Sequence, residues 1–182
     1  MHTSQELRQK AWKFATAKHQ GQFYGDEHYP YLVHLGGVLL ETIPALGENQ
    51  SLDADLAVCC AVLHDTVEDT DTTLGELAEN FGGKIAEGVA ALTKNKSLKG
   101  LSATKDSLER IRLQPAEVWV VKLADRSANL GVPPAFWTQQ KRLSYIQEAE
   151  IILQSLGGSS SCLAARLASR IDVWKNLVGI NP

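Results

Sequence analysis

The sequence lacks a long hydrophobic run. Its longest apolar stretch, residues 57–63, is far too short to cross a bilayer, and the polar N-terminal residues 1–6 lack the apolar core of a secretory signal. These two absences predict a cytoplasmic protein that has no membrane partner.

Positive charge is not concentrated anywhere in the chain. The 18 Lys and Arg residues are outnumbered by 21 Asp and Glu residues, which gives a net charge of −3, and no large basic block occurs. Binding to nucleic acid therefore has little electrostatic support and is not expected, whereas small phosphorylated ligands remain possible.

Cysteine is also scarce. Cys59, Cys60 and Cys162 are odd in number and show no spacing typical of a metal site, which favours small buried side chains in a reducing compartment. A free reactive thiol is the alternative, although nothing near these residues in the sequence would lower the pKa of a thiol.

Apolar residues are plentiful, and they recur at helical spacing. With 44% apolar content, the chain is long enough for one compact domain, which we expect to span residues 1–182. Apolar residues three or four positions apart, in segments separated by Gly and Pro, predict an all-α bundle of about eight to ten helices. Residues 22–30 are expected to form a loop, and the helix that follows is expected to end at Pro44 and Gly47.

Residues 118–125 are apolar nearly all round, which indicates burial. The β-branched side chains in this stretch leave both helix and strand open, and we favour helix because of its surroundings.

The stretch 63–69 combines an apolar face with four polar groups. On a continuous helix His64 lies one turn from Glu68, and Asp65 one turn from Asp69, so that the four side chains share an arc of about 140°. Clustered buried charges are costly unless they bind a metal ion or form an ordered charge network.

Four residues on three predicted helices could supply a metal site: His34, His64, Asp65 and Asp125. Two nitrogens and two oxygens completed by water suit octahedral manganese(II) or iron(II), whereas structural zinc would more often recruit thiolates. The alternatives are a core histidine at position 34 and, for Glu68 and Asp69, a solvated helix end.

Several of these motifs together resemble a known family. They are Tyr-Leu-Val-His at 31–34, His-Asp-Thr-Val-Glu-Asp-Thr at 64–70, Phe-Gly at 81–82, and Val-Lys-Leu-Ala-Asp-Arg at 121–126 with Asn129. Their order resembles that in the hydrolase domain of the Rel/Spo stringent-response enzymes, an HD-superfamily helical bundle, from about residue 11 to residue 156. The stand-alone small alarmone hydrolases are the most similar members of that family.

The resemblance implies an activity and a role for each motif residue. His34, His64, Asp65 and Asp125 would hold one divalent ion, most simply manganese, with iron or another divalent ion possible. Glu68 and Asp69 would orient and deprotonate the attacking water. The reaction would remove the 3′-pyrophosphate of guanosine tetra- or pentaphosphate, which gives GDP or GTP.

The resemblance also implies nucleotide contacts. Asn129 would contact the nucleotide, and Tyr145, preceded by Lys141 and Arg142, resembles a substrate-binding tyrosine with its basic neighbour. The alternatives are structural roles for Asn129 and Tyr145 and a solvated face for the two cations. Lys96 and Lys99 belong to a polar loop with three lysines, which is either solvated or able to hold phosphate.

Two departures from the family pattern bear on the substrate. Between His19-x-Gly21-Gln22 and residue 30 the family usually has an Arg-Lys pair, but this chain has Tyr24-Gly25, and Leu35 replaces the proline after His34. Tyr24 could stack on a base but cannot supply the lost charge. The chain could therefore act on another nucleotide or phosphate ester, or bind a nucleotide as a regulator without turnover. The sequence favours no oligomeric state.

Overall fold

The computed structural model describes residues 3–25 and 28–179 of the chain. Most of these residues are helical, and the only strands among them are two of two residues each, which confirms the all-α prediction. They form ten α-helices: α1 (Ser4–Lys18), α2 (Leu32–Glu48), α3 (Ala54–Leu63), α4 (Thr66–Asp69), α5 (Leu74–Phe81), α6 (Gly83–Leu92), α7 (Leu101–Arg112), α8 (Ala116–Asn129), α9 (Gln139–Leu156) and α10 (Ser161–Leu177), with a 3₁₀ turn, η1 (Gly157–Ser159), before α10. None of these helices is both long and apolar enough to span a membrane.

A short antiparallel hairpin interrupts the predicted loop 22–30. Strand β1 (Phe23–Tyr24) pairs with β2 (Tyr29–Pro30), and Tyr24 lies opposite Tyr29. Asp26 and Glu27 lie outside the described residues. Two-residue strands are too short to show an alternating pattern, so periodicity could not predict them.

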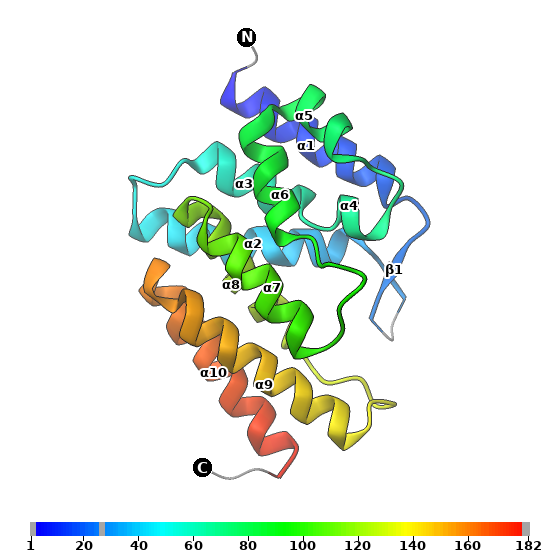
Figure 1. Ribbon diagram of the computed structural model, residues 1–182, viewed down its shortest axis with the longest axis vertical. Coiled ribbons are helices and arrows are strands. Elements are labelled where there is room, and N and C mark those ends of the chain that lie inside the picture. The colour runs from blue at the N-terminus through cyan, green and yellow to red at the C-terminus, as the bar shows by residue number, and fades with distance from the viewer. Residues whose placement is uncertain (1–2, 26–27, 180–182) are drawn as a thin grey trace.

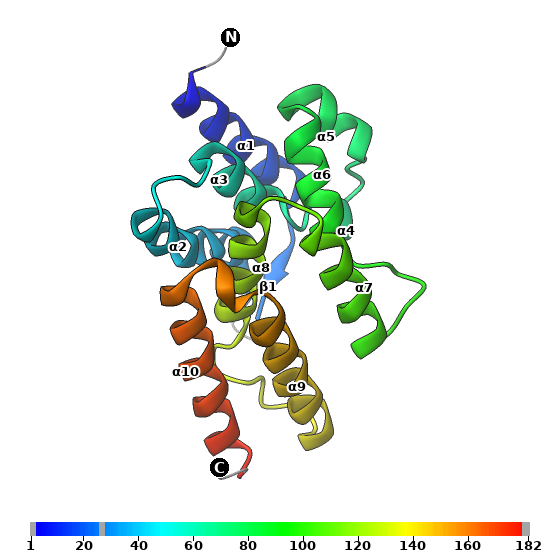
Figure 2. The same ribbon diagram turned by 60° about the vertical axis from the view of Figure 1, so that its left-hand side comes forward.

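Helices α2, α3 and α8 form the centre of the bundle (Figures 1 and 2). Helix α8 contacts α2, α3, α9 and α10, while α1, α5 and α6 lie at one end of the molecule and α9 and α10 at the other. Leu35, Leu63 and Val121, one from each central helix, are fully buried. The predicted helix at residues 118–125 is confirmed as part of α8, whose burial on nearly every side explains its continuous apolar run.

The prediction that α2 ends at Pro44 is wrong, because the helix continues to Glu48. Proline has no N–H, so the carbonyl of residue 40 loses its helical donor. Leu40 and Pro44 both lie on the exposed side of α2, where water can replace that donor.

The predicted continuous helix through residues 64–69 is also wrong. Helix α3 ends at Leu63, and α4 begins at Thr66 with Asp65 as its N-cap. The hydroxyl of Thr66 donates to the carbonyl of Leu63 at 2.7 Å, a local bond of the kind that competes with regular helix.

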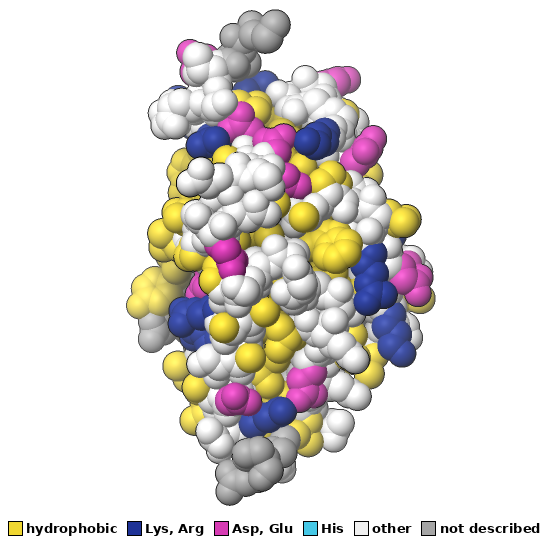
Figure 3. Space-filling model, turned by 90° about the vertical axis from the view of Figure 1, so that its left-hand side faces the viewer, with side chains coloured by type: hydrophobic (Ala, Val, Ile, Leu, Met, Phe, Trp, Pro, Cys, Tyr) yellow, Lys and Arg dark blue, Asp and Glu magenta, His cyan; other side chains and the backbone are white. Residues whose placement is uncertain are grey.

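Apolar side chains also occur on the surface. The face in Figure 3 carries them in patches between charges of both signs. A groove of about 540 Å³ between α2 and α10 is lined by Leu40, Pro44 and Leu163, among others. None of the predicted site residues lines this groove, so the candidate site lies elsewhere.

Candidate metal centre

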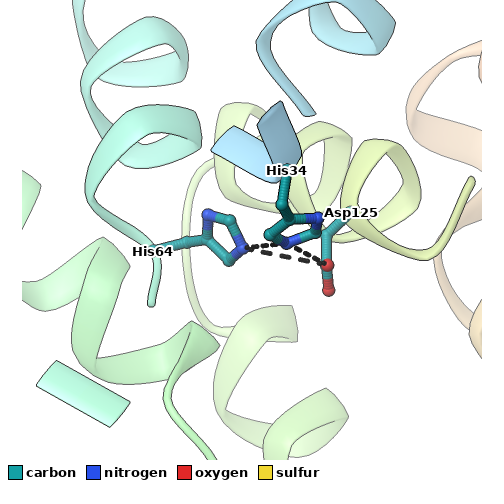
Figure 4. A group of neighbouring side chains, drawn as sticks. All are labelled: His34, His64 and Asp125. Carbon is teal, nitrogen blue, oxygen red and sulfur yellow. Dashed lines mark hydrogen bonds and ion pairs between the residues drawn. The ribbon is translucent and has the colours of Figure 1, made fainter. Parts of the chain in front are cut away.

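Three side chains from the central helices converge on one point (Figure 4). His34 comes from the first turn of α2, His64 from the end of α3, and Asp125 from α8. Each offers one ligand atom, and these atoms lie within 4.8 Å of one another. The two Nε2 atoms are 3.3 Å apart, and they lie 3.6 Å and 3.8 Å from Asp125 Oδ1.

Asp65 joins this group from the N-cap position of α4. Its Oδ2 lies 2.9 Å from His64 Nε2 and 3.3 Å from His34 Nε2. Consecutive side chains on a regular helix point about 100° apart and do not face each other. His64 keeps helical dihedral angles (φ −54°, ψ −35°), and Asp65 departs from them only modestly (φ −97°, ψ −3°), yet both side chains reach the same point.

The geometry fits a divalent ion. Adjacent ligands of an octahedral ion, each at about 2.1 Å from it, lie roughly 3 Å apart, close to the separations found here. His64 Nδ1 lies 2.9 Å from the carbonyl oxygen of Ala61, to which it donates, so Nε2 is the ring atom that faces the cluster and would bind a metal ion in exchange for its proton. Metal-binding histidines commonly have their second nitrogen fixed in this way.

The electrostatics of the cluster also favour a cation. Burial disfavours the charged imidazole of His64, but the carboxylates of Asp65 and Asp125 outweigh it and raise its pKa to about 9. Burial likewise opposes ionisation of Asp125, yet the ammonium of Lys122 and the nearby imidazoles hold the pKa of Asp125 below its ordinary value. Asp65 and Asp125 are thus ionised, and the charged imidazole of His64 balances part of their negative charge. A bound metal ion could supply that positive charge instead.

Asp125 is held from several directions. Lys122 Nζ donates to Oδ2 at 3.0 Å, and Asn129 Nδ2 donates to Oδ1 at 2.6 Å. The hydroxyl of Tyr24 donates to Asn129 Oδ1 at 3.2 Å, and the Tyr24 ring stacks on the ring of His34 with centroids 4.8 Å apart. The hairpin therefore contacts the cluster directly, and Asn129 supports Asp125.

Glu68 and Asp69 lie on different sides of α4. Glu68 Oε2 accepts from the backbone N–H of Lys94 at 2.9 Å, at the start of the lysine loop (residues 93–100). Asp69 Oδ2 accepts from the hydroxyl of Tyr31 at 3.1 Å, and the same hydroxyl lies 2.7 Å from Asp65 Oδ2. Burial and the charge of Asp65 raise the pKa of Asp69.

A cavity of about 730 Å³ opens beside the cluster. Rings and prolines dominate its lining: Tyr24, Tyr29, Pro133, Pro134, Phe136, Trp137 and Tyr145, with Asn129 on the side of the metal cluster. Tyr145 is fixed by the Trp137 ring, whose centroid is 5.0 Å away, and by the guanidinium of Arg126, 4.2 Å from the Tyr145 centroid. A flat, largely apolar group suits such a cavity.

The four predicted cations do not line this cavity. Lys141 lies over the ring of Trp137, and Arg142 Nη2 donates to the carbonyls of Pro134 and Ala135 at 3.1 Å and 3.3 Å. Lys96 and Lys99 are exposed on the lysine loop. Arg142 thus holds the wall at residues 133–137, while the two lysines remain free to turn toward a bound anion.

Comparison with known families decides where the chain belongs. The family model described as HD domain matches residues 11–156. The chain belongs to the HD-domain family. Membership in this family implies a divalent metal, which agrees with the cluster of histidine and aspartate side chains.

Similar HD-domain proteins include enzymes with a stated activity. Guanosine-3′,5′-bis(diphosphate) 3′-pyrophosphohydrolase MESH1 of Danio rerio is 33% identical over 159 residues, which cover 85% of this chain and 86% of that protein. The protein of the same name from Homo sapiens is 31% identical, with 87% and 89% covered. Guanosine-3′,5′-bis(diphosphate) 3′-pyrophosphohydrolase of Aquifex aeolicus is 32% identical over 91% of this chain, but over only 22% of its own length.

A solved structure shares the fold of this HD domain. It is described as a metazoan ortholog of SpoT that hydrolyzes ppGpp and plays a role in starvation responses. The TM-score is 0.75 at 25% sequence identity, and the match covers 96% of this chain and 97% of the other.

Sequence reasoning missed two residues of this HD domain that contact the cluster. Lys122 pairs with Asp125, and its signal was a single cation in an otherwise apolar segment, three residues before a carboxylate. Tyr31 contacts Asp65 and Asp69, which lie 34 and 38 residues further along the chain. No local pattern predicts such a pairing.

Proposed function

We propose that this chain is a metal-dependent hydrolase that removes the 3′-pyrophosphate of guanosine 3′,5′-bis(diphosphate). The observation that carries the proposal is the convergence of His34, His64 and Asp125 beside an aromatic cavity. The proposal is further supported by two relatives that are named for this activity. The match to this chain covers 86% and 89% of their length.

The metal ligands in this proposal are His34, His64, Asp65 and Asp125, and the ion is manganese. A ligand set of two imidazoles and two carboxylates suits manganese(II) better than it suits a softer metal ion that prefers thiolate ligands. When bound, a divalent ion would neutralise phosphate charge and make a water molecule more acidic. Lys122 keeps Asp125 ionised and fixes its Oδ2, so that Oδ1 faces the two imidazoles.

Proton transfer in this proposal belongs to Glu68 and Asp69. Asp69 is oriented by the Tyr31 hydroxyl at Oδ2, and its Oδ1 is the oxygen that we propose takes a proton from the attacking water. Glu68 is anchored at Oε2 by the backbone of Lys94, and its second oxygen, Oε1, lies 3.7 Å from Lys94 Nζ, a long contact that still allows it to help orient that water. The raised pKa of Asp69 brings it closer to the value that suits a general base near neutral pH.

The nucleoside would occupy the aromatic cavity. Rings such as those of Tyr24 and Tyr145 offer flat surfaces for a base, and Asn129 has one remaining N–H for a sugar or base oxygen. Phosphates that extend beyond the cavity could be met by Lys96 and Lys99 of the lysine loop. Lys141 and Arg142 would act on the cavity wall rather than on phosphate.

The test is a product analysis. The purified chain, stripped with a chelator and resupplied with manganese, is incubated with guanosine tetraphosphate and pentaphosphate, and the products are separated by chromatography. GDP or GTP together with pyrophosphate is the expected outcome. Release of single phosphates, or no turnover of either compound, would contradict the proposal.

A second candidate is hydrolysis of a different nucleotide at the same metal centre. The observation that favours it is the position of Tyr24, which lies against His34 where related enzymes are expected to place an arginine. Adding adenine and pyrimidine nucleotides to the same assay separates the two candidates, because the second predicts a higher kcat/KM for one of these than for guanosine tetraphosphate.

A further inference from the structure

Two carboxylates with different proposed tasks meet at one hydroxyl. Asp65, a proposed metal ligand, and Asp69, the proposed proton acceptor, occupy the two ends of α4. The Tyr31 hydroxyl lies 2.7 Å from Asp65 Oδ2 and 3.1 Å from Asp69 Oδ2. We propose that Tyr31 is a positioning residue that sets the direction of both carboxylates, so that one atom tunes both metal affinity and turnover.

The ring of Tyr31 is itself fixed. The His19 ring stacks on it with centroids 4.5 Å apart and planes 12° apart, and the His34 ring meets it edge-on at 5.5 Å. The backbone N–H of Tyr31 donates to the carbonyl of Gln22 at 3.0 Å. A ring held on two sides and at its backbone presents its hydroxyl in one place, which is what a positioning group requires.

A second chain of hydrogen bonds ties the same segment to the end of α4. Buried His19 approaches Gln22 Oε1 through Nδ1 at 2.7 Å, and Gln22 Nε2 donates to the carbonyl of Asp69 at 2.7 Å. Because Gln22 uses its amide N–H toward Asp69, its oxygen must accept, so His19 Nδ1 carries the proton. Gln22 therefore fixes the backbone of Asp69, while Tyr31 fixes its side chain.

The two supports act on different sets of residues. Among the proposed metal ligands and proton-transferring carboxylates, the Gln22 side chain hydrogen-bonds to Asp69 alone, whereas Tyr31 touches both Asp69 and the ligand Asp65. A phenol has one proton, so the two carboxylates share a single donor. Removing the oxygen of Tyr31 takes that donor away from both. Loss of the Tyr31 hydroxyl should thus weaken metal binding and chemistry together, and loss of the Gln22 amide should affect chemistry only.

This inference rests on the proposed function for its kinetic part, but its metal-binding part is independent of any substrate. Tyr31→Phe keeps the stacked ring and removes one oxygen. Metal-stripped protein is titrated calorimetrically with manganese(II) chloride alone, and kcat and KM are then measured with guanosine tetraphosphate. Supporting partners of metal ligands are typically worth 10–100-fold in metal affinity or activity, so we expect the Kd for manganese to rise by about that factor.

The kinetic result should separate positioning from binding. In Tyr31→Phe kcat should fall by about 10-fold or more, with KM within about twofold of wild type. The reason is that the hydroxyl contacts the two carboxylates and does not line the cavity proposed for the nucleotide. Gln22→Met should lower kcat by a smaller factor and leave the manganese affinity unchanged. Thr42→Val is the matched control, since it removes a buried hydroxyl of α2 that donates to the carbonyl of Val38 and contacts neither carboxylate.

Each outcome decides the proposal. Wild-type manganese affinity and kcat in a folded Tyr31→Phe variant would overturn it, as would a rise in KM alone. If circular dichroism shows that Tyr31→Phe does not fold, the Gln22→Met variant tests the proposal, since Gln22 is only half-buried. Wild-type kcat in that variant would contradict the proposed hydrogen-bond network around Asp69. If the wild-type protein does not hydrolyse guanosine tetraphosphate, the proposed function fails, but the manganese titration still tests Tyr31.

Discussion

The metal cluster and the lysine loop differ in how firmly the fold determines their side chains. His34, His64 and Asp125 are only 3%, 4% and 7% exposed, and each comes from or directly follows one of the central helices. Lys96 and Lys99 are exposed on a loop between α6 and α7. A buried charged side chain in the cluster has no water or other group to replace a lost partner. An exposed lysine on the loop, in contrast, can exchange one anion for another at little cost.

This difference predicts an order of sensitivity to mutation. Changes in the cluster should remove activity and stability together, changes in the carboxylates around it should reduce turnover, and changes at the rim should alter substrate binding by small factors.

The largest effect is expected for Asp125→Asn. The variant should lose metal binding and hydrolysis, because the negative charge that balances the ion is removed. Lys122 would also lose its buried counter-charge, which typically destabilises a protein by about 3–5 kcal/mol. Elemental analysis, the rate of hydrolysis and Tm measure these effects.

The control for Asp125→Asn is Asp106→Asn in α7, which breaks a more exposed ion pair with Arg110. Such pairs are worth about 0–1 kcal/mol, so the control should keep its metal and its activity. An Asp125→Asn protein with one metal ion per chain and full activity would remove the proposed site. Asp65→Asn tests the fourth ligand in the same way.

The cluster was also the part of the molecule that could be predicted best from the sequence. His34, His64, Asp65 and Asp125 were singled out by motif, and the structure brings them together. The break after Leu63 was not predictable, because helical periodicity continues through residues 64–69. Tyr31 and Lys122 escaped prediction because their contacts depend on tertiary packing, and the direction of Arg142 toward residues 134–135 depends on a loop that only the fold defines.

The next prediction concerns Glu68, one step outside the cluster. Glu68→Gln keeps the shape of the side chain and an oxygen for the backbone N–H of Lys94, but it removes the charge and with it the ion pair with Lys94 Nζ at 3.7 Å. We expect the metal to remain bound and kcat to fall by about 10²–10⁴-fold, with little change in KM, as is typical when acid–base assistance is lost. Loss of metal would instead make Glu68 a ligand, and unchanged turnover would reduce it to an anchor for the lysine loop.

Tyr24 lies between the cluster and the cavity and should have an intermediate effect. A base stacked on an aromatic ring is typically worth about 1–3 kcal/mol, so Tyr24→Ala should raise KM for a purine nucleotide by roughly 5–150-fold. Tyr24→Phe keeps the ring and loses only the bond to Asn129, so its KM should stay close to that of the wild type. Equal KM values for both variants and the wild type would mean that the hairpin only closes the edge of the cavity.

The smallest effect is expected for Lys99→Ala on the lysine loop. An exposed cation contributes roughly 0–1 kcal/mol, so KM should rise by no more than about fivefold. The rise should be larger for guanosine pentaphosphate than for a nucleotide with fewer phosphates, and it should shrink with added salt. Lys105→Ala, also exposed but on α7, is the matched control and should leave KM unchanged for every substrate. An effect of Lys99→Ala as large as that of Asp125→Asn would show that the rim is as firmly determined as the cluster.

The central claim is that the buried cluster holds a divalent ion on which hydrolysis of a guanosine polyphosphate depends. The most direct test is the rate at which chelator-stripped protein releases pyrophosphate from guanosine tetraphosphate as manganese(II) is added back. The account predicts no measurable rate before addition and saturation at one ion per chain. Undiminished hydrolysis by the stripped protein, or no hydrolysis once one ion per chain is bound, would contradict it.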